Sequence, residues 1–233
     1  NILNPNKKSI SFQFWINFPP EESIEQTVFQ KLEEDTGLSL FVAESDANKA
    51  DLRFVVSSGS NVMSASYVIP KNEFVHLSTY FDREATGLSN LKIFHTGTLV
   101  ASSSNSVTFG EMNFSSSPLL LGSGSAHPLG NLDSGDFSPL VTLSASLDDF
   151  RCYHGKRSPR DIRADYLKNA YPSSDLKLYF KFNEASGSYV NNQVILDSSG
   201  NSLHSNISNF NFKSRDQRMG TPPLPLERSD RNP

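Results

Sequence analysis

Alternation of apolar and polar residues is the feature that most restricts the fold of this chain. In the stretch SISFQFWINF, which starts at Ser9, every second position is apolar: Ile10, Phe12, Phe14, Ile16 and Phe18. A β-strand projects successive side chains to opposite faces, so this spacing predicts a strand with one buried face. The same alternation recurs in GLSLFVAES, ADLRFVVSS, EFVHLSTYFD and DLKLYFKF. The chain is therefore expected to consist mainly of β-sheets.

Turn and helix signals refine this expectation. The pair Thr96-Gly97 lies between two short apolar runs and predicts a tight hairpin, because glycine adopts the positive φ that such a turn needs. In RSPRDIRADYLKNAYP, Ser158 is a suitable N-cap and Pro159 fits the first helical position, which predicts one short helix near residues 159–168. About nine to twelve short strands with one helix are typical of an all-β, antiparallel two-sheet sandwich or jelly roll.

Composition excludes several partners. The 233-residue chain has a net charge of −4 and no cluster of Lys and Arg, so nucleic acid is not an expected partner. No apolar run approaches the roughly 20 residues that span a bilayer, so membrane insertion is not expected. Cys152 is the only cysteine, which excludes an intrachain disulfide. The chain begins with Asn1 and not with Met, and we interpret it as an excerpt of a longer protein.

A series of short motifs follows in a recognisable order. They are Trp15, then His76, Tyr80 and Asp82, then Gly97, then Gly122 and Ser123, then Asp148, Asp149, Arg151 and Tyr153, and then Ser158 to Ile162. In this order, over most of residues 9–167, the chain resembles the laminin G-like, concanavalin A-like jelly-roll family. The resemblance implies a concanavalin A-like sandwich. The sequence departs from the family pattern at Phe74, where Trp is usual, and at Thr96, where Asp or Asn is usual.

The segment LYFKFNEASGSYVNNQVILDSSGNS, which starts at Leu178, resembles the strand and loop that normally open a domain of this family. Either the domain is circularly permuted, or the chain is cut from a tandem repeat. Too few residues follow Leu178 for a second jelly roll. We therefore expect a single domain over residues 1–212, with its last strands in 176–212, and an extended Pro-rich linker over 213–233. Burial of Phe180 and Phe182 against residues 9–167 would support the permuted domain, and their exposure would indicate a chain cut from a tandem repeat.

Acidic residues in two places suggest a metal site. Alternation puts Asp148 on the same strand face as Phe150 and Cys152, where a carboxylate needs a partner. The resemblance places the loop DSSGNS, with Asp197 and Asn201, near this strand. Since Ca²⁺ takes oxygen ligands, a structural calcium site formed by Asp148, Asp197 and Asn201 is predicted. In the alternative, Asp148 accepts backbone or Arg hydrogen bonds and Asp197 forms an Asx-turn.

Trp15 is the candidate ligand-binding residue. It lies on the strand face opposite to Phe12 and Phe14, so it is either a sugar-stacking platform or a residue that packs beneath the helix or a neighbouring domain. No catalytic residue is predicted. Retaining glycosidases need two carboxyl groups about 5 Å apart, and the Glu-x-Asp-x-Glu strand that would supply them is missing from the sequence.

The resemblance implies a non-catalytic recognition or assembly module of a larger surface or virion structural protein. Such a module would bind glycan or a neighbouring protein domain through its loops or a sheet face, outside the cell or on a virion surface. The Pro-rich tail favours assembly into an array or homo-oligomer, because an extended arm reaches an adjacent domain. The alternative is a divergent glycoside hydrolase or lyase of the same fold.

Overall fold

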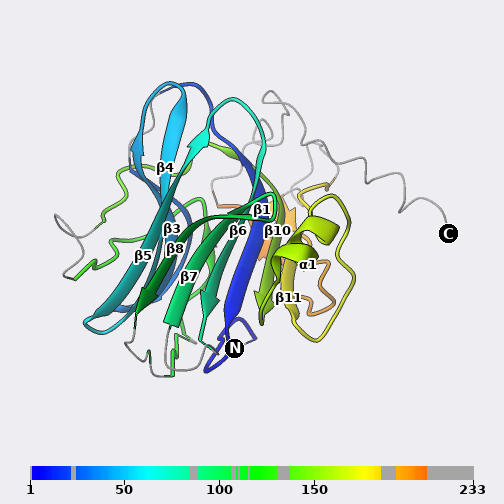
Figure 1. Ribbon diagram of the computed structural model, residues 1–233. Coiled ribbons are helices and arrows are strands. Elements are labelled where there is room, and N and C mark those ends of the chain that lie inside the picture. The colour runs from blue at the N-terminus through cyan, green and yellow to red at the C-terminus, as the bar shows by residue number, and fades with distance from the viewer. Residues whose placement is uncertain are drawn as a thin grey trace.

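The computed structural model shows two antiparallel sheets packed face to face (Figure 1). It describes residues 2–21, 25–83, 89–105, 109, 111–114, 116–130, 137–184 and 193–208. The six-stranded sheet has the order β11-β10-β1-β6-β7-β8, and the five-stranded sheet has the order β5-β4-β3-β2-β9. The predicted jelly-roll sandwich is confirmed.

The strands of the six-stranded sheet are β1 (Ile10–Asn17), β6 (Val75–Asp82), β7 (Ser89–His95), β8 (Thr98–Asn105), β10 (Ser146–His154) and β11 (Leu176–Phe180). Those of the five-stranded sheet are β2 (Gln26–Glu33), β3 (Thr36–Ser45), β4 (Lys49–Ser58), β5 (Asn61–Pro70) and β9 (Leu120–Leu121). A small separate ladder joins β12 (Val194–Ile195) and β13 (Ser205–Asn206).

The predicted helix forms as α1 (Pro159–Asp165), with Ser158 as its N-cap. The Ser158 hydroxyl accepts a hydrogen bond from the Asp161 N–H, and the Asp161 carboxylate accepts one from the Ser158 N–H. This reciprocal arrangement satisfies donors that the first turn leaves unpaired. α1 ends three residues before the predicted boundary, because the Lys168 N–H bonds to the Asp165 carbonyl in a tighter turn.

The core lies between the sheets and is rich in phenylalanine. Phe29 of β2 packs against three phenylalanines of the opposite sheet. Its ring centroid lies 4.5 Å from that of Phe12, 5.9 Å from that of Phe14 and 5.8 Å from that of Phe150. The alternation found in the sequence thus brings the two sheets together through one aromatic cluster.

Strand β11 lies at an edge of the six-stranded sheet and pairs antiparallel with β10, with Phe180 opposite Phe150. Leu178 and Phe180 are buried in the common core, and Phe182 is partly buried against it. The segment that resembles an opening strand therefore covers the same core as β1. The expected linker over 213–233 lies outside the described residues, so it stays a prediction, as does the domain boundary.

The predicted hairpin joins β7 to β8. Both Thr96, with φ of 49°, and Gly97, with φ of 74°, adopt positive φ, as a two-residue type I′ turn requires. The Gly97 carbonyl accepts a hydrogen bond of 2.7 Å from the Arg163 side chain of α1. The turn thus also anchors the helix.

Thr96→Asn should raise the free energy of unfolding by about 1 kcal/mol, because a β-branched residue is strained at positive φ and Asn tolerates it. Chemical denaturation measures the change. Thr98→Asn, two residues along in β8, is the matched control and should bring no gain. Equal or lower stability of Thr96→Asn would contradict the turn geometry.

Candidate functional site

An open recess of about 550 Å³ lies where β1 begins and β10 ends. The N-terminal segment runs past this end of the sheet (Figure 1). The segment supplies Ile2 and residues 4–8 to its lining, and Glu111, His154 and Lys177 complete it. Four separate parts of the chain therefore meet here. Ile2 and Pro5 are the apolar residues of the lining, and the other seven lining residues carry amide, ammonium, carboxylate or imidazole groups.

The N-terminal segment is held in place by the loop around Met112. The Met112 N–H donates a 3.2 Å hydrogen bond to the Asn6 carbonyl, and Asn6 pairs with Met112 in an isolated antiparallel bridge. The Arg83 guanidinium donates to the same Asn6 carbonyl and to the Phe109 carbonyl. These contacts position the side chains of the recess.

Asn4 forms the inner wall of the recess. Its Nδ2 donates to Asn6 Oδ1 at 3.0 Å and to Asn113 Oδ1 at 2.9 Å, which fixes the orientation of the amide. The side chain is only 8% exposed, and its Oδ1 has no hydrogen-bond partner in the protein. The Asn4 side chain thus lines the recess and carries a buried acceptor that no protein group binds.

His154, the last residue of β10, provides a second such atom. Its ring is 7% exposed, and Nε2 has no hydrogen-bond partner in the protein. Burial, together with the positive charges of Lys177 and Lys8, lowers the pKa of His154 to about 4, although a hydrogen bond with the Leu3 backbone opposes the shift. The ring is therefore neutral at pH 7.

The lowered pKa of His154 predicts that the stability of the folded protein depends on pH. His154 has an ordinary pKa of 6.5, so between pH 6.5 and about 4 the unfolded chain binds a proton that the folded protein does not. The contribution of the neutral His154 ring to the free energy of unfolding is therefore complete above pH 6.5 and is lost as the pH falls to about 4. When the melting temperature is measured against pH, it should fall less for His154→Gln than for the wild type between pH 6.5 and about 4. The same dependence of melting temperature on pH in both proteins would contradict a neutral, buried His154 ring.

The lining of the recess offers hydrogen-bonding groups of both kinds. Hydroxyl groups donate and accept hydrogen bonds, and the recess offers both kinds of partner. Among the residues that the structure describes, its lining contains one carboxylate, Glu111, whereas glycosidases use two. Sequence analysis did not find the recess, because its residues are ordinary individually and come from distant segments.

Trp15 does not lie on an open surface. It is 4% exposed, with its ring centroid 5.3 Å from that of His76 and 6.0 Å from that of Tyr166. Its Nε1 donates a 3.3 Å hydrogen bond to the Tyr166 carbonyl at the end of α1. The structure thus shows the second interpretation, packing beneath the helix segment, and not an exposed stacking platform.

Asp148 lies on a different face from the one that alternation predicts. A bulge in the β1–β10 pairing, with Asp149 at φ of 54°, places Asp148 opposite Trp15 on the outer face of the sheet. Phe150 and Cys152 stay in the core. The prediction that Asp148 shares their face is wrong, because the bulge adds one residue to the strand.

Asp197 and Asn201 do lie together, next to β11. Asp197 accepts backbone hydrogen bonds from Tyr179 and Ser199 on Oδ1 and from Leu203 on Oδ2, and Oδ2 also accepts from the Ser199 hydroxyl. Although burial opposes ionisation, these hydrogen bonds lower the pKa of Asp197. Asn201 Nδ2 donates to the carbonyls of Leu176 and Lys177.

This arrangement does not fit a calcium site well. Calcium needs several available oxygens, and both carboxylate oxygens of Asp197 already accept hydrogen bonds. Nowhere in the described ranges do three or more His, Cys, Asp or Glu side chains gather. The hydrogen bonds around Asp197 match the Asx-turn alternative.

Asp197→Ala should lower the free energy of unfolding by about 2–3 kcal/mol, because several buried donors lose a charged acceptor. Asn206→Ala, an exposed position of β13, is the control. The melting temperature of the wild type should be the same with millimolar Ca²⁺ and with chelator. A rise with Ca²⁺ that Asp197→Ala removes would instead establish the calcium site.

Comparison with known proteins identifies the family. A family model described as the concanavalin A-like lectin/glucanases superfamily matches residues 1–163. The chain belongs to this superfamily. The resemblance found in the sequence is therefore confirmed. No curated protein sequence matches this concanavalin A-like chain.

Solved structures are similar to this chain to different degrees. One is a Bacteroides ovatus protein provisionally named as carbohydrate-binding, with a TM-score of 0.57 and 14% identity, over 87% of this chain and 55% of that one. Another is the botulinum neurotoxin serotype C1 binding domain, with a TM-score of 0.42 and 14% identity, over 67% of this chain and 35% of that one. The concanavalin A-like chain thus spans about half of the first and a third of the second. No helix in the described ranges is long and apolar enough to cross a membrane.

Proposed function

We propose that this concanavalin A-like chain is a non-catalytic module that recognises a glycan in the recess beside its N-terminal segment. The observation that carries the proposal is a pair of buried, unpaired polar atoms, the acceptor Asn4 Oδ1 and the ring nitrogen His154 Nε2, on residues that line an open recess. A buried acceptor without a partner costs about 1–3 kcal/mol, and a sugar hydroxyl that donates to it removes this cost. Membership of a lectin and glucanase superfamily supports the same chemistry.

The charged groups at the rim would complete the contact. Lys8 and Lys177 offer ammonium donors, and Glu111 offers a carboxylate acceptor. Polar side chains that bind hydroxyls through both donors and acceptors are the usual means of orienting a ligand in a pocket. The rival hydrolase activity would need a second carboxylate beside Glu111.

A glycan array with fluorescently labelled protein tests the proposal. His154→Phe replaces the imidazole by a phenyl ring without nitrogens, and should weaken binding of any glycan that the wild type retains by about tenfold, which is the loss of one good hydrogen bond. His95→Phe is the matched control, because His95 lies on β7 away from the recess and should leave binding unchanged. No signal on any glycan, or equal loss in both variants, would overturn the proposal.

We also place the module in a larger protein on a cell or virion surface, where a glycan is accessible. Incubation of wild type and Glu111→Gln with the retained glycan separates recognition from catalysis. Recognition leaves the glycan intact in both samples. Cleavage by the wild type that Glu111→Gln abolishes would establish the enzyme alternative.

A further inference from the structure

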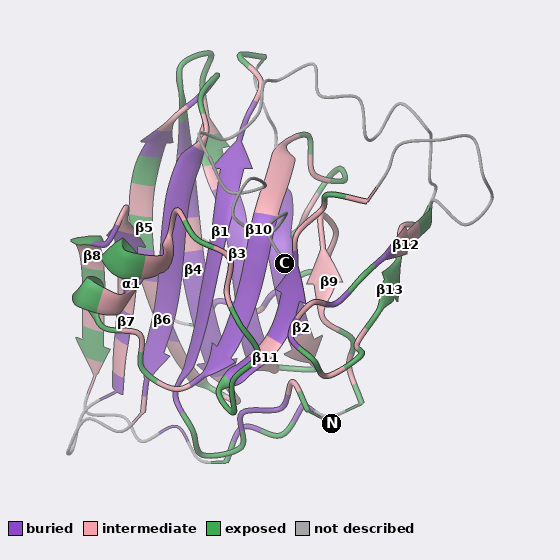
Figure 2. Ribbon diagram, turned by 90° about the vertical axis from the view of Figure 1, so that its right-hand side faces the viewer, coloured by how far each residue is buried: buried purple, intermediate pink, exposed green. Residues whose placement is uncertain are grey.

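A row of polar side chains lies on the outer face of the six-stranded sheet, beneath the segment that contains α1. Gln13 of β1 is opposite Ser78 of β6, and His76 of β6 is opposite Trp15. Gln13 and Ser78 are 0% exposed and His76 is 1% exposed. We call Gln13, His76 and Ser78 the buried polar strip. Figure 2 shows these buried strands behind α1.

Four hydrogen-bonding atoms of the strip have no partners in the protein. Both amide atoms of Gln13, the Ser78 hydroxyl and His76 Nδ1 are unpaired. Burial, with the charges of Arg151 and His95, lowers the pKa of His76 to about 3, so its ring is neutral at pH 7. Such atoms destabilise the folded state unless something binds them, and apolar side chains here would avoid that cost. The strip therefore calls for a polar occupant.

Aromatic rings border the strip. Trp15 and Tyr166 stand beside His76, with the His76 and Tyr166 ring centroids 5.5 Å apart. Tyr80 and Phe94 form a small apolar cluster with one residue of α1. A surface of rings beside amide, hydroxyl and imidazole groups suits a ligand with an apolar face and several hydroxyl groups.

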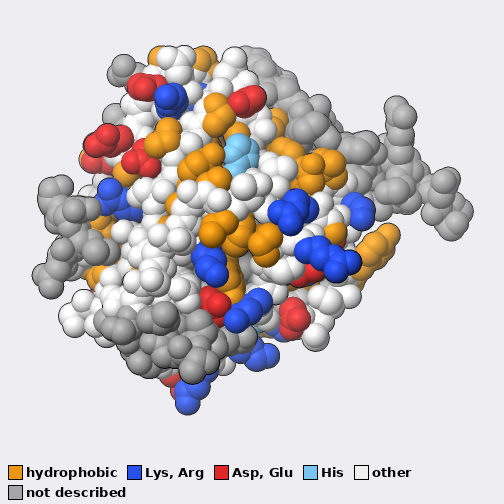
Figure 3. Space-filling model, viewed as in Figure 1, with side chains coloured by type: hydrophobic (Ala, Val, Ile, Leu, Met, Phe, Trp, Pro, Cys, Tyr) orange, Lys and Arg blue, Asp and Glu red, His pale blue; other side chains and the backbone are white. Residues whose placement is uncertain are grey.

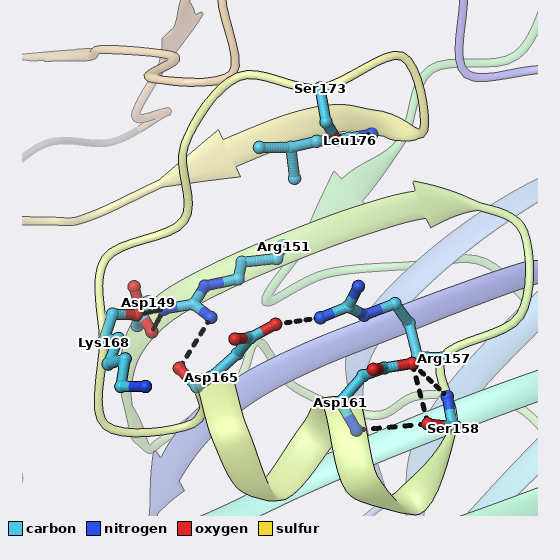
Figure 4. A network of polar contacts seen from close by, with 9 residues as sticks. All are labelled: Asp149, Arg151, Arg157, Ser158, Asp161, Asp165, Lys168, Ser173 and Leu176. Atoms are coloured by element: carbon cyan, nitrogen blue, oxygen red, sulfur yellow. Dashed lines mark hydrogen bonds and ion pairs between the residues drawn. The ribbon is translucent and has the colours of Figure 1, made fainter.

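The cover over the strip is small and mostly polar. The seven-residue α1 buries a single side chain, Ile162, which packs against Tyr80 and Phe94. Hydrogen bonds also attach the cover, from Arg163 to the Gly97 carbonyl, from Arg151 to the carbonyls of Asp165 and Lys168, and from Trp15 to the Tyr166 carbonyl. The Tyr166 ring packs against Trp15 and His76. Figure 4 shows Arg151 reaching from the sheet to this segment, and Figure 3 shows positive side chains gathered over it. Movement of the cover would uncover the rings of Trp15, Tyr80 and Phe94, which the apolar face of a bound sugar would shield again.

We propose that the buried polar strip is a second binding site, for a neutral saccharide, and that the α1 segment is a displaceable cover over it. The site is separate from the recess and does not depend on the function proposed there. The amide of Gln13 would bind adjacent hydroxyls as donor and acceptor, Ser78 and His76 would complete the polar contacts, and Trp15 would face the sugar ring.

Loosening the cover tests this. Cellotriose, maltotriose and mannotriose are titrated into wild type and Ile162→Ala, with binding followed by saturation-transfer NMR. Ile162→Ala populates the open form, so its affinity for at least one trisaccharide should rise about tenfold over wild type. Adding Gln13→Met should abolish this gain, whereas adding His154→Phe, in the recess, should preserve it.

The stability of Gln13→Met provides an independent readout. Methionine has a similar shape and no unpaired amide, so the melting temperature of the single variant should rise. Where Ile162→Ala does not fold, Arg163→Ala, which removes only the hydrogen bond to Gly97, takes its place in the titration. No gain in affinity from either cover variant, or a gain that survives Gln13→Met, would overturn the proposal.

Discussion

Asp149→Ala should lower the free energy of unfolding by about 3–5 kcal/mol, the cost of leaving a buried charge without its partner. Arg151 is 1% exposed and forms an ion pair with Asp149, also buried (Figure 4). The guanidinium also donates to the carbonyls of Asp165 and Lys168, which close the segment after α1. Without the carboxylate, a positive charge stays buried in the sheet.

Asp165→Ala is the matched control for this variant. Its partner Arg157 is more exposed, so loss of that ion pair should cost below about 1 kcal/mol. Urea denaturation of both variants gives the comparison. Equal losses would contradict the view that burial determines the energetic weight of the Asp149–Arg151 pair.

Phe29→Ala should also lower the free energy of unfolding by about 3–5 kcal/mol, because it opens a cavity where the two sheets meet. Phe29 is fully buried, and its ring contacts Phe12, Phe14 and Phe150 across the core. The remaining rings belong to different strands and cannot easily fill the space. Leu140→Ala is the control, since Leu140 is exposed and its loss should change stability by less than about 0.5 kcal/mol. A small effect of Phe29→Ala would mean that the sheets do not pack through this cluster.

Most of the fold could be predicted from local sequence patterns. Alternation located β1 and β11, the Thr96-Gly97 pair located the hairpin, and Ser158 with Pro159 located α1. Each of these signals acts over a few residues, where side-chain periodicity and backbone preference determine the local structure.

Predictions that depend on distant contacts were less successful. The bulge at Asp149 leaves no clear local signal, and it moved Asp148 to the outer face. Trp15 is on the predicted side of β1, but only the tertiary structure shows that the α1 segment covers it. The recess depends on Asn4 and His154, which are 150 residues apart in sequence, and no periodicity links them.

A titration of ¹⁵N-labelled protein with a glycan retained on the array tests the central claim most directly. Binding in the recess predicts the largest chemical-shift changes at the amides around Asn4, Asn6, Glu111, His154 and Lys177. His154→Phe should weaken these changes, and His95→Phe should not. Glycan binding in the recess would be contradicted if the signals of these amides did not move and the largest chemical-shift changes occurred at amides outside this set and outside the α1 segment.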